Sequence, residues 1–130
     1  MVSEARKRPG RADDGLSLWL ASKAPDDLYL SVLVLGETRQ GVERLRRTDP
    51  LSAARLDPWV DSLEQQYGRR ILPVTEEIAQ QWGRANARRR YPAVDGLMAA
   101  TAVVHDLTLV TRNERDVEGS GARTLNPFSG

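Results

Sequence analysis

The sequence contains no cysteine among its 130 residues. Disulfides, iron–sulfur clusters and cysteine nucleophiles are therefore excluded, and the absence fits a reducing compartment. No run approaches the roughly 18 consecutive apolar residues that span a bilayer. Residues 1–15 are charged and lack the apolar segment of a secretory signal. These absences predict a cytoplasmic protein with no membrane partner.

Charge of one sign is also missing, because the formal net charge is only +1. No strong field marks a nucleic-acid or membrane partner. Nearly all of the 19 cationic side chains are arginine, which suits bidentate phosphate contacts. A GC-rich genome also produces an arginine-rich protein, so the composition does not choose between these readings. The length predicts a single domain over residues 1–130 with one continuous core.

Short apolar runs alternate with segments of helical periodicity along the chain. The expected strands are "LYLS" at 28–31, "RILPV" at 70–74, "LTLV" at 107–110 and "ARTLNPF" at 122–128. The expected helices cover 16–23, a stretch from about Val32, one or two helices within 49–68, a helix from Thr75 to before Pro92, and 96–104. This alternation predicts an α/β layer fold with a mainly parallel sheet.

Two of the expected helices have distinctive sequence features. Thr75 is a predicted N-cap, and Glu76 and Glu77 follow in the first turn, where the helix dipole favours acids. Residues 96–104 are apolar on every side, so a helix here must be buried all round.

Three acids occupy unusual places. Asp95 opens the apolar helix, Asp116 follows the "LTLV" strand, and Glu37 lies near the start of the helix after "LYLS". In parallel α/β sheets, sites form where strands end and helices begin. We therefore expect the three acids to converge at one edge of the sheet.

Clustered carboxylates repel one another, and a hard divalent cation removes that conflict. Mg²⁺ and Mn²⁺ take oxygen ligands, and such a metal activates water for phosphodiester cleavage. The constellation therefore suggests a metal-dependent nuclease. Each acid also has an ordinary reading: Asp95 as an N-cap, Glu37 as a solvated helix residue, and Asp116 as a turn residue.

The run "RRRYP", Arg88 to Pro92, stands just before Asp95. Arginine and aromatic groups suit a single-stranded RNA backbone, and a solvated helix end with favourable cations is the alternative. Arg112, beside the expected acid cluster, is suited either to hold a phosphate or to pair with an acid.

The motifs together resemble the PIN-domain family, in particular the VapC/FitB-type toxins of toxin–antitoxin pairs. "SVLVLGETRQGVERL" is similar to the family's second acidic motif and places its acid at Glu37. "VDGLMAATAVVHDLTLVTRNERDV" resembles the third and fourth motifs, with acids at Asp95 and Asp116 and with Thr111 and Asn113 beside them. "TLNPF" is similar to the closing strand.

The resemblance implies a Rossmann-like three-layer α/β/α fold and an endoribonuclease toxin that cleaves RNA with Mg²⁺- or Mn²⁺-activated water. It implies catalytic and metal-binding roles for Glu37, Asp95 and Asp116. Substrate contacts are expected from Thr111, Arg112 and Asn113. The implied protein partners are a cognate antitoxin and a second copy in a homodimer.

The sequence departs from the family at its start. Family members begin with an apolar strand ending in Asp-Thr-Asn, whereas Met1 here stands directly at "MVSEARK". The central strand and the first acid are thus expected to be missing, and the neighbouring strands would lose their ladder partner at about 1–3 kcal/mol for each unpaired group. A start codon upstream of the printed one, or a decayed gene, would explain this.

Three functional hypotheses follow. The chain is an active RNase, a catalytically inert module that acts only through dimer or antitoxin binding, or a metal-dependent DNase on the same scaffold. Recognition of the 2′-hydroxyl separates RNA from DNA, and it depends on geometry.

Overall fold

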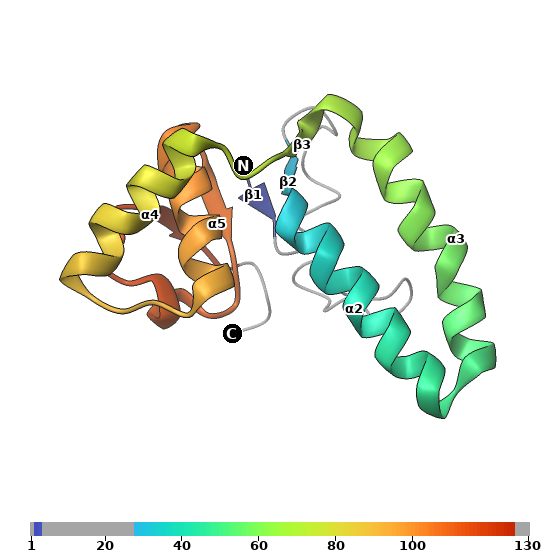
Figure 1. Ribbon diagram of the computed structural model, residues 1–130. Coiled ribbons are helices and arrows are strands. Elements are labelled where there is room, and N and C mark those ends of the chain that lie inside the picture. The colour runs from blue at the N-terminus through green and yellow to red at the C-terminus, as the bar shows by residue number, and fades with distance from the viewer. Residues whose placement is uncertain (1, 4–27, 127–130) are drawn as a thin grey trace.

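The computed structural model describes residues 2–3 and 28–126 (Figure 1). The strands are β1 (Val2–Ser3), β2 (Tyr29–Ser31), β3 (Ile71–Leu72), β4 (Thr108–Val110) and β5 (Arg123–Leu125). The helices are α2 (Val32–Thr48), α3 (Pro50–Tyr67), α4 (Glu76–Arg88) and α5 (Ala93–Val104), with short 3₁₀ helices η2 (Gly68–Arg70) and η3 (Glu114–Val117). The helix expected over 16–23 lies outside the described residues.

The five strands form one parallel sheet in the order β3-β2-β1-β4-β5. The expectation that the central strand is missing is therefore wrong, because a short strand occupies the central position. Val2 pairs with Tyr29 on one side and with Leu109 on the other, so β1 fills the position between β2 and β4. A segment of two residues is enough to join the two ladders, and the neighbouring strands keep a partner.

The helices form two antiparallel hairpins. In Figure 1 the α4–α5 hairpin lies on one side of the molecule and the α2–α3 hairpin on the other, with β1 and β2 between them. The predicted α/β fold with a parallel sheet is confirmed. None of the helices in the described ranges is both long enough and apolar enough to cross a membrane.

Local sequence signals account for most helix ends. Ser31 caps α2 by accepting a hydrogen bond from the amide of Leu33 at 3.1 Å. Thr75 caps α4 as predicted, accepting from the amide of Ile78 at 3.2 Å. Residues 49–68, predicted as one or two helices, contain the single helix α3, which has Pro58 in its interior.

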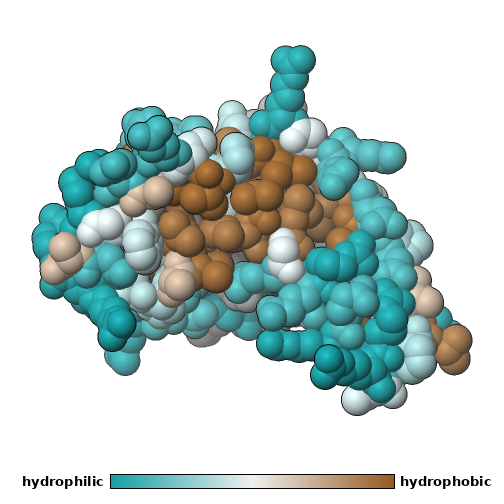
Figure 2. Space-filling view, viewed as in Figure 1, coloured by the Kyte–Doolittle hydropathy of each residue, from teal (hydrophilic) through white to brown (hydrophobic). Residues whose placement is uncertain are grey.

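The main core lies between the sheet and α5. Met98, Ala99 and Ala102 of α5 pack with Leu30 of β2 and Leu109 of β4, and all are almost completely buried. The expectation of a helix buried all round over 96–104 is confirmed for Gly96 and residues 98–102, whereas Leu97, Val103 and Val104 are only partly buried. Figure 2 shows apolar residues gathered on the surface between the two helical hairpins, surrounded by hydrophilic ones.

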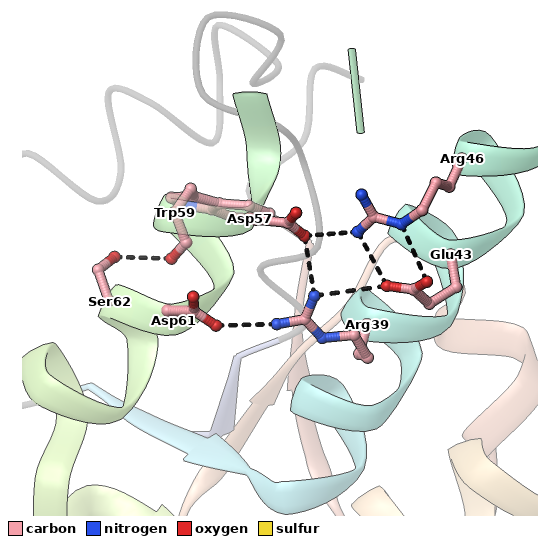
Figure 3. Close-up of polar contacts among 7 residues, drawn as sticks. All are labelled: Arg39, Glu43, Arg46, Asp57, Trp59, Asp61 and Ser62. Carbon is pink, nitrogen blue, oxygen red and sulfur yellow. Dashed lines mark hydrogen bonds and ion pairs between the residues drawn. The ribbon is translucent and has the colours of Figure 1, made fainter. Parts of the chain in front are cut away.

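The α2–α3 hairpin has a small apolar cluster of its own, made by Val42, Ala53 and Val60. A network of ion pairs lies beside this cluster and links the two helices (Figure 3). Its members are Arg39, Glu43 and Arg46 of α2 and Asp57 and Asp61 of α3.

Candidate functional site

The carboxyl ends of the strands define one edge of the sheet, because all five strands run parallel. Helix α2 begins at this edge, directly after β2. Helix α5 runs back across the sheet before β4, so its N-terminus lies at the same edge. Ligand sites of α/β sheets form in this region, and the three predicted acids lie on elements that start or end here.

Asp95 is the third residue of α5 and lies in its first turn. The N-cap of this helix is Pro92, which makes no side-chain capping hydrogen bond. The reading of Asp95 as the N-cap is therefore wrong. A carboxylate in the first turn is stabilised by the helix dipole, and Asp95 is only partly buried, so it remains accessible at the edge.

Asp116 lies within η3, and its amide donates to the carbonyl of Asn113 at 3.0 Å. It lines an open pocket of about 440 Å³ together with Arg112, Asn113, Glu114, Arg115 and Asn126. Helix α5 packs against η3, so the elements that carry Asp95 and Asp116 are in contact. Two of the three predicted acids are thus placed on neighbouring elements.

The three predicted substrate-binding residues separate into two kinds. Thr111 is buried, and its hydroxyl accepts a hydrogen bond from the amide of Asn113 at 3.0 Å, which shapes the turn after β4. Arg112 and Asn113 are exposed and line the pocket. The geometry places these two where they can contact a ligand, whereas the Thr111 hydroxyl lies beneath them.

Asn126 lines the same pocket but was not among the residues singled out from the sequence. It directly follows β5, whose carboxyl end lies at the same edge of the sheet as that of β4. The sequence signal that could have identified Asn126 as a pocket residue is its place after the last strand, in "TLNPF".

Glu37 lies in the second turn of α2, and its Oε1 atom is buried. The reading of Glu37 as a solvated helix residue therefore does not hold. Strands β2 and β4 flank β1, so they are two strand spacings apart, which is about 10 Å. Glu37 follows β2 and Asp116 follows β4, so β1 lies between the two strands that precede these acids.

No three histidine, aspartate or glutamate side chains within residues 28–126 come close enough together to hold a metal ion. The expected gathering of Glu37, Asp95 and Asp116 into one tight group is thus not seen in this part of the chain. Mg²⁺ is commonly bound by one or two carboxylates, with water and substrate phosphates as the other ligands. Asp95 and Asp116 have the oxygen donors for that simpler mode.

Comparisons with known proteins give a consistent result. The family described as PIN domain matches residues 10–118. The chain is 32% identical to "Toxin FitB" of Neisseria gonorrhoeae over 119 residues, which cover 85% of this chain and 82% of that protein. It is 28% identical to "VapC ribonuclease Y4jK" of Sinorhizobium fredii, covering 98% of this chain and 93% of that protein.

Solved structures show the same likeness. The chain is similar to "FitAB bound to IR36 DNA fragment", with a TM-score of 0.85 and 26% identity over 100% of this chain and 97% of that one. It is also similar to "FitAcB from Neisseria gonorrhoeae", with a TM-score of 0.81 and 27% identity over 98% of both chains. These values confirm the architecture of the whole described region.

Proposed function

The chain belongs to the PIN-domain family, and on that premise we propose that it is the nuclease toxin of a toxin–antitoxin pair, with RNA as its substrate. The relatives named FitB toxin and VapC ribonuclease support the class of activity. The observation that supports the proposal is the packing of α5, which carries Asp95, against η3, which carries Asp116.

The proposed chemistry is hydrolysis of a phosphodiester bond. Asp95 and Asp116 would hold Mg²⁺ or Mn²⁺, and the bound cation supplies charge neutralisation and an activated water. Arg112 and Asn113 line the pocket beside Asp116, where a guanidinium and an amide can hold phosphate oxygens. Glu37, which has a buried carboxylate oxygen and lies on the helix that follows β2, is the third proposed acid.

The proposed protein partners are an antitoxin and a second copy of the chain. The similar solved structures are of FitAB bound to a DNA fragment and of FitAcB, and they support an antitoxin as partner. The apolar surface between the two helical hairpins supports a protein partner on physical grounds, because exposed apolar areas tend to be covered by one (Figure 2).

The test is cleavage of a fluorescent RNA by the 130-residue chain while Mg²⁺ is titrated. Asp95→Asn and Asp116→Asn should abolish metal-dependent cleavage, and Glu37→Gln should lower it. Glu64→Gln removes a carboxylate from the exposed face of α3 and should leave the rate unchanged. Unchanged cleavage by Asp95→Asn would overturn the assignment, and a DNA strand of the same sequence tests the DNase alternative.

A second candidate is a binding module without catalysis. It is favoured by the finding that the described ranges contain no group of three acids placed to hold a metal. The two functions differ in one measurement: the module leaves RNA intact at every Mg²⁺ concentration while the chain still forms a complex with its antitoxin.

A further inference from the structure

The arginines in the run before α5 differ in their contacts. Arg89 follows the last residue of α4 and has an extended backbone, with φ −153° and ψ 139°. Its Nη2 donates to the carbonyl of Arg115 at 3.0 Å, and its Nη1 donates to the carbonyl of Glu118. These two carbonyls lie on either side of Asp116 in the chain. One guanidinium therefore spans the η3 turn.

Tyr91 reaches the same turn. Its hydroxyl donates to the carbonyl of Glu118 at 3.0 Å, and the guanidinium carbon of Arg89 lies 4.9 Å from the centre of its ring. The amide of Tyr91 donates to Oδ1 of Asn86 at 2.8 Å, which ties it to the end of α4. Arg89 and Tyr91 thus form one unit, here called the Arg89–Tyr91 clamp.

The clamp also touches the first turn of α5. A Cβ atom built on Gly96 would lie 3.1 Å from Cβ of Tyr91, so the tyrosine sits directly against the backbone next to Asp95. Tyr91 is buried, with 6% of its surface exposed. A single side chain therefore contacts both elements that carry the two neighbouring acids.

We propose that Arg89 and Tyr91 are positioning residues that hold Asp116 in place relative to Asp95. This inference rests on the proposed nuclease function. Loops that are not tied down open locally at little cost, and a carboxylate on such a loop loses its orientation. The clamp replaces that freedom with three hydrogen bonds to main-chain carbonyls.

The neighbouring residues provide matched controls. Arg88 and Arg90 are exposed and carry the same charge as Arg89. If the three arginines bound RNA through their charge, the loss of any one of them would raise KM by a similar factor, and the effect would depend on salt concentration. If Arg89 acts by positioning, its loss lowers kcat and the loss of the other two does not.

The experiment compares Arg89→Met, Arg89→Lys and Tyr91→Phe with Arg88→Met and Arg90→Met in the 130-residue chain. Arg89→Met should lower kcat by about 10- to 100-fold, the usual effect of losing a residue that orients a ligand. KM should stay within about twofold. Arg89→Lys should not restore kcat, because an ammonium group lacks the planar fork that spans two carbonyls. Tyr91→Phe, which keeps the ring, should show a smaller loss.

Amide hydrogen exchange gives a readout that does not require activity. The amides of Asp116, Glu118 and Ser120 donate to carbonyls within this turn, so they should exchange faster in Arg89→Met and Tyr91→Phe than in the native chain. Unchanged exchange refutes the clamp. Faster exchange with unchanged kcat, or an equal loss of kcat in Arg88→Met and Arg90→Met, refutes the positioning role.

A native chain that cleaves no RNA would refute the proposed function rather than the clamp. The positioning role would then be decided by binding of Mn²⁺ alone, followed by electron paramagnetic resonance. Arg89→Met should weaken Mn²⁺ binding by the same factor of about 10 to 100, and equal affinity would overturn the proposal.

Discussion

Arg46 of α2 and Asp57 of α3 are joined by a hydrogen bond of 2.7 Å from Nη2 to Oδ1 (Figure 3). The same carboxylate oxygen accepts from Nη1 of Arg39 at 3.0 Å. Arg46 also binds both carboxylate oxygens of Glu43, each at 3.0 Å. Isolated surface pairs contribute little, but a network with shared, charge-assisted hydrogen bonds contributes more. The α2–α3 hairpin is therefore held by charge as well as by its small apolar cluster.

Acidification should weaken this hairpin. The hydrogen bond from Arg46 holds the pKa of Asp57 below its ordinary value, and the same donor lowers the pKa of Glu43. A carboxyl group whose pKa is lower in the folded chain than in the unfolded chain stabilises the fold at pH values above the unfolded pKa, which is roughly 4. This stabilisation is lost as the pH falls through the folded-state pKa. The melting temperature should therefore fall between about pH 5 and about pH 3.

Asp57→Asn should flatten that pH dependence, because the amide does not titrate. Glu64→Gln changes an exposed carboxylate of the same helix and should retain the native slope. Thermal unfolding followed by circular dichroism at several pH values measures both. Parallel curves for the native chain and Asp57→Asn would contradict the role given to this residue.

Gly96→Ala should destabilise the fold. The new Cβ would lie 3.1 Å from Cβ of Tyr91 and 3.2 Å from Cδ1 of Trp82, and neither contact is with the end of a flexible side chain. Overpacking of this kind costs about 1–3 kcal/mol. Gly83→Ala is the control, because that glycine lies within α4 with nothing within 4 Å of a new Cβ. The free energy of unfolding of Gly83→Ala should be about 0.5–1 kcal/mol higher than that of the native chain. Urea denaturation should therefore show a loss of stability for Gly96→Ala and a gain for Gly83→Ala.

Leu30→Ala should be the more damaging of two leucine truncations. Leu30 of β2 is 1% exposed and belongs to the main core, whereas Leu51 of α3 is 72% exposed. Loss of a buried leucine costs about 2–5 kcal/mol, and an exposed one usually changes stability by less than about 0.5 kcal/mol. Equal denaturation midpoints for the two variants would contradict the placement of Leu30 in the main core.

Mg²⁺ should raise the melting temperature, because a ligand that binds only the folded chain stabilises it by mass action, by about 2.7 kcal/mol at 100 times Kd. EDTA should remove the effect. Asp116→Asn and Asp95→Asn should reduce it, whereas Glu64→Gln should not. NaCl at the same ionic strength controls for screening, and an identical shift with NaCl would refute a specific cation site.

Local sequence signals determined much of the fold. Thr75 with Glu76 and Glu77 marked the start of α4, and the helix begins there because a side-chain oxygen and two acids satisfy its first turn. The apolar run from Gly96 required a buried helix, and α5 is buried against the sheet. Alternation of such segments implied parallel strands, and therefore a common edge for the three acids.

Contacts between distant segments were decided only by the tertiary structure. Val2–Ser3 is a strand only because β2 and β4 leave a space between them, which no local propensity of two residues reveals. The same placement sets β2, which precedes Glu37, and β4, which precedes Asp116, on opposite sides of β1. Arg89 has exposed arginines on both sides in sequence, and its role comes from carbonyls 26 and 29 residues further along the chain. Periodicity and capping are local properties of a sequence, whereas these pairings depend on how the folded layers meet.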